Sequence, residues 1–175
     1  MQEQSFTDEN AFARVWSRVT AGLSEQLTPQ QEQQRAEACL QQAEGVLLLQ
    51  LLEQTQRLAA RYRQLARRCG PVRRTLSALY AARRRCAQQL RLEYYLRTGE
   101  SLPQPADTPA MPGVLSALRA AWLAEGELER ACRDAACRTG STELAGLYLE
   151  QAGTAQTHAR TLRRLIEGML GQEDT

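Results

Sequence analysis

The amino-acid sequence predicts an all-α protein built as a four-helix bundle. Apolar residues recur at steps of three and four along nearly the whole chain, which is the spacing of one face of a helix. The sequence contains no alternating Val, Ile and Thr runs of the kind that mark strands. Clusters of Gly and Pro divide the chain into five helical stretches. With 175 residues, 43% of them hydrophobic, the chain is long enough to bury one apolar core.

The first predicted helix covers about Thr7 to Leu23 and begins at Thr7 and Asp8, which are good N-cap residues. We expect it to form an accessory arm within residues 1–28, ahead of a bundle over residues 29–175. One face of this helix is apolar and carries Phe12, Val15, Trp16, Val19 and Leu23.

The second predicted helix runs from about Pro29 to Arg68. Thr28 is its expected cap, and Pro29 lies in the first turn, where a missing N–H costs little. At about 1.5 Å per residue such a helix approaches 60 Å, so a break near Gly45 is compatible with the sequence. Cys69-Gly70-Pro71 should end it, because Gly tolerates a left-handed C-terminal cap and Pro cannot continue a helix.

The third predicted helix runs from about Val72 to Arg97 and ends at Thr98-Gly99. Four prolines follow within Ser101 to Gly113, which makes this segment too stiff for a helix and too long for a tight turn. We interpret it as a crossover. The fourth and fifth helices should cover Val114 to Arg138 and Thr142 to Leu170, separated by a short turn. Two antiparallel hairpins joined by one long crossover form the ferritin-like version of the four-helix bundle.

Helical spacing also predicts which side chains point into the bundle. Most are apolar, but one layer is polar and consists of Thr55, Arg83 with Cys86, Glu125 and His158. The inward tyrosines Tyr62, Tyr94 and Tyr148 are interpreted as packing residues, as is Trp122. Cys86 and Cys132 are interpreted as small core fillers. The full predicted inward set is Leu47, Leu51, Thr55, Leu58, Tyr62, Leu65, Leu76, Leu79, Arg83, Cys86, Leu90, Tyr94, Leu118, Trp122, Glu125, Leu128 or Glu129, Cys132, Leu144, Tyr148, Gln151, Ala155, His158, Leu162 and Leu165.

Several segments resemble the rubrerythrin-like branch of the ferritin-like superfamily. The resemblance covers nearly the whole chain, and FARVWSRV, from Phe12 to Val19, is similar to a lead-in helix of some bacterial members. The other segments are LAARYRQLARR (58–68), LRLEYYLRTGE (90–100), AWLAEGELERACRDAACR (121–138) and ELAGLYLEQAGTAQTHARTLRRLI (143–166).

The resemblance implies where a di-iron centre would lie and that most of its ligands are lost. The family uses a Glu from each of two helices and a Glu-x-x-His from each of the other two. Of the corresponding residues here, only Glu125 and His158 keep the ligand type. One carboxylate and one imidazole cannot hold two irons. We therefore expect no cofactor and no oxidoreductase activity; the alternative is iron or zinc at Glu125, His158 and Cys86. The vestigial positions are Thr55, Arg83, Cys86, Glu125, Ala155 and His158.

Arg83 stands where the resemblance implies a Glu, and this suggests a replacement for the metal. A lone buried carboxylate is costly unless it is paired. We hypothesise that the Arg83 guanidinium pairs with Glu125, with Thr55 and neutral His158 completing the hydrogen bonds. Alternatively, Arg83 reaches solvent like its neighbours in the run Arg83 to Arg85, and Glu125 does likewise.

Charge is distributed unevenly along the chain. Between Gln54 and Leu92 there are eleven Arg and no acidic residue, although the net charge of the whole chain is only +2. This cationic hairpin could bind nucleic acid, an acidic protein or an acidic patch on a second copy, which also makes a homodimer plausible. The simpler alternative is a solvated surface. The residues that would contact a polyanion are Arg67, Arg68, Arg73, Arg74, Arg84 and Arg85.

The sequence also bears on location. The polar start MQEQSFTDEN has no secretory signal, and the apolar run from Gly45 to Leu52 is far shorter than the roughly 20 residues of a membrane-spanning helix. Five cysteines without a C-x-x-C pair favour reduced thiols. We expect a cytoplasmic protein without a membrane span that serves a non-catalytic structural or interaction role; the alternatives are a residual metal-binding protein or oxidoreductase, and a polyanion binder.

Overall fold

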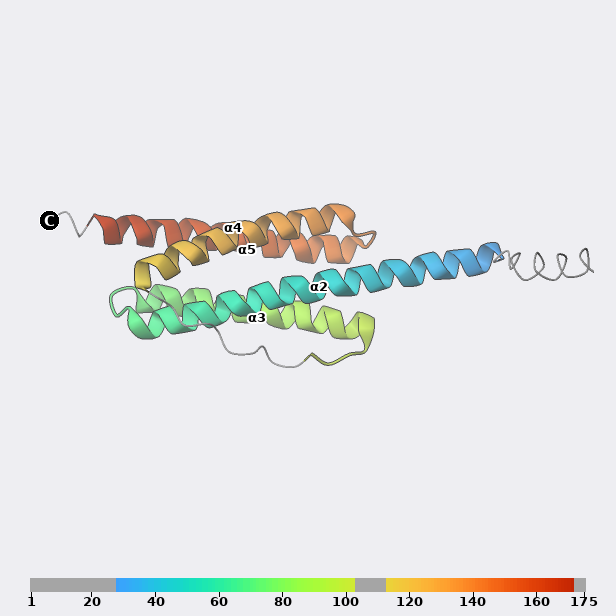
Figure 1. Ribbon diagram of the computed structural model, residues 1–175, viewed down its shortest axis with the longest axis horizontal. Helices are drawn as coiled ribbons and strands as arrows, with labels where there is room; N and C mark the ends of the chain where they lie inside the picture. The colour runs from blue at the N-terminus through green and yellow to red at the C-terminus, as the bar shows by residue number, and fades with distance from the viewer. Residues whose placement is uncertain (1–27, 103–112, 172–175) are drawn as a thin grey trace, which may run out of the picture. The chain divides into compact units, whose positions relative to one another are not determined.

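The computed structural model describes residues 28–102 and 113–171. All four elements in these ranges are helices (Figure 1): α2 (Pro29–Arg68), α3 (Arg73–Thr98), α4 (Val114–Arg138) and α5 (Thr142–Leu170). The prediction of an all-α four-helix bundle with two packed hairpins is confirmed. The predicted arm from Thr7 to Leu23 lies outside the described residues, as does most of the predicted crossover.

Helix α2 begins as predicted, with Thr28 as its cap. Thr28 Oγ1 accepts a hydrogen bond from the backbone N–H of Gln31 at 3.4 Å, and Gln31 Oε1 accepts one from the N–H of Thr28 at 2.9 Å. These reciprocal bonds form a capping box. The helix continues through Gly45 without the break that its length allowed. The chain divides into two compact units, Met1–Leu40 and Gln41–Thr175, and the core described below belongs to the second.

The turn between α2 and α3 differs from its prediction. The expected left-handed cap at Gly70 is wrong, because Gly70 does not have a positive φ. Instead the N–H of Arg73 donates to the carbonyl of Gly70 at 3.2 Å, which closes a turn around Pro71. Pro presets the φ of the second residue of such a turn, and Gly70 in the first position needs no positive φ. The left-handed glycine cap lies at the end of α3, where Gly99 has φ 70° and its N–H donates to Tyr95 O at 2.8 Å.

The turn between α4 and α5 is short, and Ser141 caps α5. Its Oγ accepts a hydrogen bond from the N–H of Leu144 at 3.3 Å and another from Arg97 Nη2 at 3.3 Å. This cap satisfies one of the N–H groups that a helix start leaves without an intrahelical partner.

We expect Ser141→Ala to lower the free energy of unfolding by about 1 kcal/mol, because the cap N–H loses its acceptor. Chemical denaturation followed by circular dichroism measures this. Ser116→Ala is a suitable control, since exposed Ser116 donates to the carbonyl of Gly113 rather than accepting from a helix N–H. Equal effects of the two substitutions would contradict the capping role.

The core follows the predicted stripes with three exceptions. Trp122 was predicted to point inward, but it is 40% exposed, and Ala121 is buried in its place. Glu125 points directly into the core, and Trp122 and Ala121, three and four positions earlier, lie on either side of that direction. Of these two, the smaller Ala121 is the one that packs into the core. Leu48 rather than Leu47 is fully buried at the start of the core, and Leu165 is only partly buried. Of the two alternatives on α4, Leu128 is the buried one.

A second polar cluster joins the two hairpins within the Gln41–Thr175 unit. Glu44 of α2 accepts from Arg97 Nη1 of α3 at 3.0 Å and from Thr139 Oγ1, after α4, at 2.6 Å. Arg97 also pairs with Glu93 one turn earlier, at 2.7 Å. One glutamate therefore links three elements. Among the described helices, none is both long enough and apolar enough to cross a membrane.

Candidate functional site: a buried charged layer

One side chain from each helix contributes to a buried polar layer: Tyr62 of α2, Arg83 of α3, Glu125 of α4 and His158 of α5. Arg83 and Glu125 have no exposed surface. Arg83 Nε donates to Glu125 Oε1 at 3.0 Å, and Arg83 Nη2 forms an ion pair with Glu125 Oε2. The predicted pairing of Arg83 with Glu125 is therefore present, and the alternative that both reach solvent is wrong. Two parallel bonds are the strong bidentate form of an Arg–carboxylate pair.

The remaining donors to Glu125 come from the other two helices. Tyr62 Oη donates to Glu125 Oε1 at 2.5 Å, and His158 Nδ1 lies 3.1 Å from the same oxygen. Because an ionised carboxylate only accepts, Nδ1 must carry the proton in this contact. The Tyr62 and His158 rings meet edge to face, with centroids 6.1 Å apart. Glu125 therefore receives hydrogen bonds from all three neighbouring helices.

The pKa shifts show that the layer favours an ionised Glu125 and a neutral Tyr62. Burial by itself raises the pKa of Glu125, but the hydrogen bonds from His158 and Arg83 and the Arg83 charge hold it below its ordinary value. Burial lowers the pKa of Arg83, yet the hydrogen bond and charge of Glu125 raise it overall. Burial, together with the Glu125 charge, raises the pKa of Tyr62 far above its usual range. The pair stays charged and Tyr62 stays a donor.

Thr55 does not play the role predicted for it. Its side chain is buried, as expected, but Thr55 Oγ1 makes no hydrogen bond, and neither does Arg83 Nη1. The prediction that Thr55 completes the hydrogen bonds of the pair is wrong. Tyr62 takes this role, although its sequence position was interpreted as packing. The hydroxyl group of Tyr62 could have indicated this role in the sequence, because a buried tyrosine usually hydrogen-bonds its hydroxyl to a polar partner.

The residues of the layer do not fit a metal centre. All six vestigial positions are buried, including Cys86 and Ala155. Yet across residues 28–102 and 113–171 no three His, Cys, Asp or Glu side chains are grouped to hold a metal ion. Both oxygens of Glu125 are already bound by Arg83, and burial raises the pKa of the Cys86 thiol, which disfavours the thiolate that a metal needs. The alternative ligand set of Glu125, His158 and Cys86 therefore has no supporting geometry.

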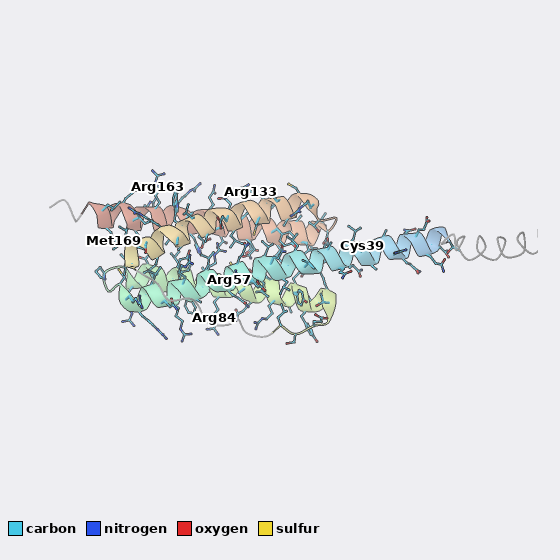
Figure 2. All side chains as sticks on the ribbon, in the orientation of Figure 1. Cys39, Arg57, Arg84, Arg133, Arg163 and Met169 are labelled. Atoms are coloured by element: carbon cyan, nitrogen blue, oxygen red, sulfur yellow. The ribbon has the colours of Figure 1, made fainter. Side chains whose placement is uncertain are left out.

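The arginines predicted to contact a polyanion lie on the surface. All six of them, Arg67, Arg68, Arg73, Arg74, Arg84 and Arg85, are exposed. Figure 2 shows Arg84 on the outside of α3. Arg83, between these residues in sequence, is the exception, because it points into the core.

The described helices thus define an all-α four-helix bundle with a buried charged layer. A scan against protein-family models finds no match, and neither the curated proteins nor the solved structures include a significant match to this chain.

Proposed function

We propose that this chain is a ferritin-like bundle of the rubrerythrin type in which an ion pair replaces the di-iron centre, and that it serves as a non-catalytic structural or interaction protein. The observation that carries this proposal is the Arg83 guanidinium bound to both oxygens of Glu125 at a fully buried position. A positive group lies where the family would hold its cations, and it neutralises the one carboxylate that remains.

The placement of the vestigial positions supports the same proposal. The vestigial positions Thr55, Cys86 and Ala155 are buried like the other three, although Ala155 has no polar side chain and Thr55 no hydrogen bond. Their inward direction is what a chain that lost its ligands would keep. Both carboxylate oxygens of Glu125 already accept hydrogen bonds from its neighbours, so neither is left open to bind a metal ion.

The proposal predicts that restoring the ligands restores metal binding. The quadruple variant Thr55→Glu, Arg83→Glu, Cys86→His and Ala155→Glu regains the full family ligand set. We expect it to bind about two Mn²⁺ or Fe²⁺ per chain, measured by elemental analysis after removal of free metal, whereas the wild-type chain binds none.

A triple variant that keeps Arg83 and carries the other three changes is the matched control. It should bind no metal pair, because the guanidinium still occupies the site and repels cations. Circular dichroism establishes that each variant remains helical. A helical quadruple variant without bound metal would remove the proposed ancestry, and stoichiometric metal in the wild-type chain would contradict the replacement of the centre.

A further inference from the structure

The outer surface of α3 carries a row of arginines that the buried layer does not use. Arg73 and Arg84 are eleven residues apart, as are Arg74 and Arg85. Eleven residues are close to three helical turns, so each pair repeats on the same side of α3 at a separation of about 16 Å. We call Arg73, Arg74, Arg84 and Arg85 the α3 arginine surface.

This surface is not neutralised by nearby acids in the sequence. No Asp or Glu occurs between Gln54 and Leu92. The situation differs on the α4 side of α2, where Arg57 pairs with Glu53 at 3.3 Å and shares a shallow hollow with Arg61 and Glu127. The α3 arginine surface therefore carries positive charge without an acidic residue close in sequence, and such a surface attracts anions over a Debye length of about 8–10 Å.

The residues between the two arginine pairs indicate what kind of anion fits. The exposed side chains there are Ser77, Ala78 and Ala81, all of them small, whereas the larger Tyr80 is half-buried against the core. A protein interface is usually centred on large aromatic or apolar anchors, and none of these three residues provides one. Small side chains instead allow an extended polymer backbone, such as a row of phosphates, to lie close to the helix.

We propose that the α3 arginine surface binds the phosphate backbone of double-stranded nucleic acid without regard to sequence. The inference rests on the proposed role as an interaction protein and names its partner class. Duplex DNA carries one negative charge per about 1.7 Å of its axis, so it presents phosphates to both arginine pairs in any register. Arginine forks bind phosphate oxygens in bidentate fashion. Single strands fit less well, because the one aromatic residue between the pairs, Tyr80, is half-buried and packs against the core instead of standing free for base stacking.

Fluorescence anisotropy with a labelled 24-base-pair duplex tests the proposal on the full chain. We expect binding in 50 mM salt that weakens about a hundredfold in 200 mM salt, as four phosphate contacts require. A variant with Arg73, Arg74, Arg84 and Arg85 all changed to Gln should lose measurable binding.

The matched control changes four exposed arginines of the other hairpin, Arg119, Arg130, Arg160 and Arg164, to Gln. It removes the same formal charge, so a weakening of less than about fivefold is expected if contact rather than net charge drives binding. Equal losses in the two variants would overturn the proposal, as would the absence of wild-type binding in 20 mM salt. Polyglutamate binding without duplex binding would assign the surface to an acidic protein and overturn it too.

The two sets of experiments separate this inference from the proposed function. None of the eight substitutions alters Arg83 or its partners. A failure of duplex binding leaves the metal-restoration result unchanged, and a failure of metal restoration leaves duplex binding unchanged.

Discussion

Replacing Arg83 by Met is expected to lower the free energy of unfolding by about 3–5 kcal/mol, because it leaves the Glu125 carboxylate buried without its cation. Tyr62 and His158 still contact Oε1, but Oε2 loses its partner, Arg83. An unpaired buried charge costs far more than a lost surface contact. Guanidinium denaturation at pH 7, followed by circular dichroism at 222 nm, measures the change.

Two further variants locate the origin of this effect. Arg84→Met changes an exposed neighbour in the same run and should alter stability by less than about 0.5 kcal/mol. The double variant Arg83→Met with Glu125→Leu removes both charges, and we expect it to recover most of the loss, since apolar replacement of a buried pair is often neutral or stabilising. A loss of less than 1 kcal/mol for Arg83→Met, with full helicity, would show that the pair contributes little.

Alkaline pH is expected to unfold the protein steeply. Burial raises the pKa of Cys132 to about 12 and that of Tyr148 to about 12, and it raises that of Tyr62 as well. Below about pH 7.5 these groups are protonated in both states, so they add no pH dependence. Above it the unfolded chain releases protons that the folded chain retains, so stability falls as pH rises. Between its pKa in the unfolded chain and its raised pKa in the folded protein, each such group lowers the free energy of unfolding by about 1.4 kcal/mol per pH unit.

The effect can be assigned to one residue by removing its hydroxyl. Tyr148 Oη makes no hydrogen bond, so Tyr148→Phe keeps the packing and removes one ionisable group. Between pH 10 and 11 its stability should fall by about 1 kcal/mol less than that of the wild type, because the unfolded tyrosine is about half ionised at pH 10 and almost fully ionised at pH 11. Tyr95→Phe, at a 53% exposed position, is the matched control and should leave the slope unchanged. Constant stability from pH 9 to 11 would contradict the burial of these groups as the cause.

The helices were predictable because their signals are local. The bounds of α4 and α5 agree with the sequence prediction at both ends, and those of α3 agree to within one residue at each end. Periodic apolar residues and the caps at Thr28 and Gly99 depend only on near neighbours in the chain. The turn at Gly70 was predicted incorrectly because Gly before Pro is compatible with more than one kind of turn, and the choice depends on how the two helices pack.

The buried layer was only partly predictable. Helical spacing identified Arg83, Glu125 and His158 as inward residues, and the cost of a lone buried carboxylate indicated the ion pair. Spacing defines a direction around a helix but not how far a side chain reaches across the bundle. For that reason Thr55 was predicted as a partner in place of the longer Tyr62. Trp122 was predicted inside for a different reason, because Ala121 and Trp122 flank the direction of Glu125 on α4 and spacing does not choose between them.

The sequence by itself determined that this chain forms helices, where they begin and end, and which face of each is apolar, because these properties follow from backbone periodicity and local capping. Only the tertiary structure decided that Glu125 receives donors from all three other helices and that Thr55 makes no hydrogen bond. Those contacts depend on the register and distance between helices far apart in the chain, which the packing of the whole core sets.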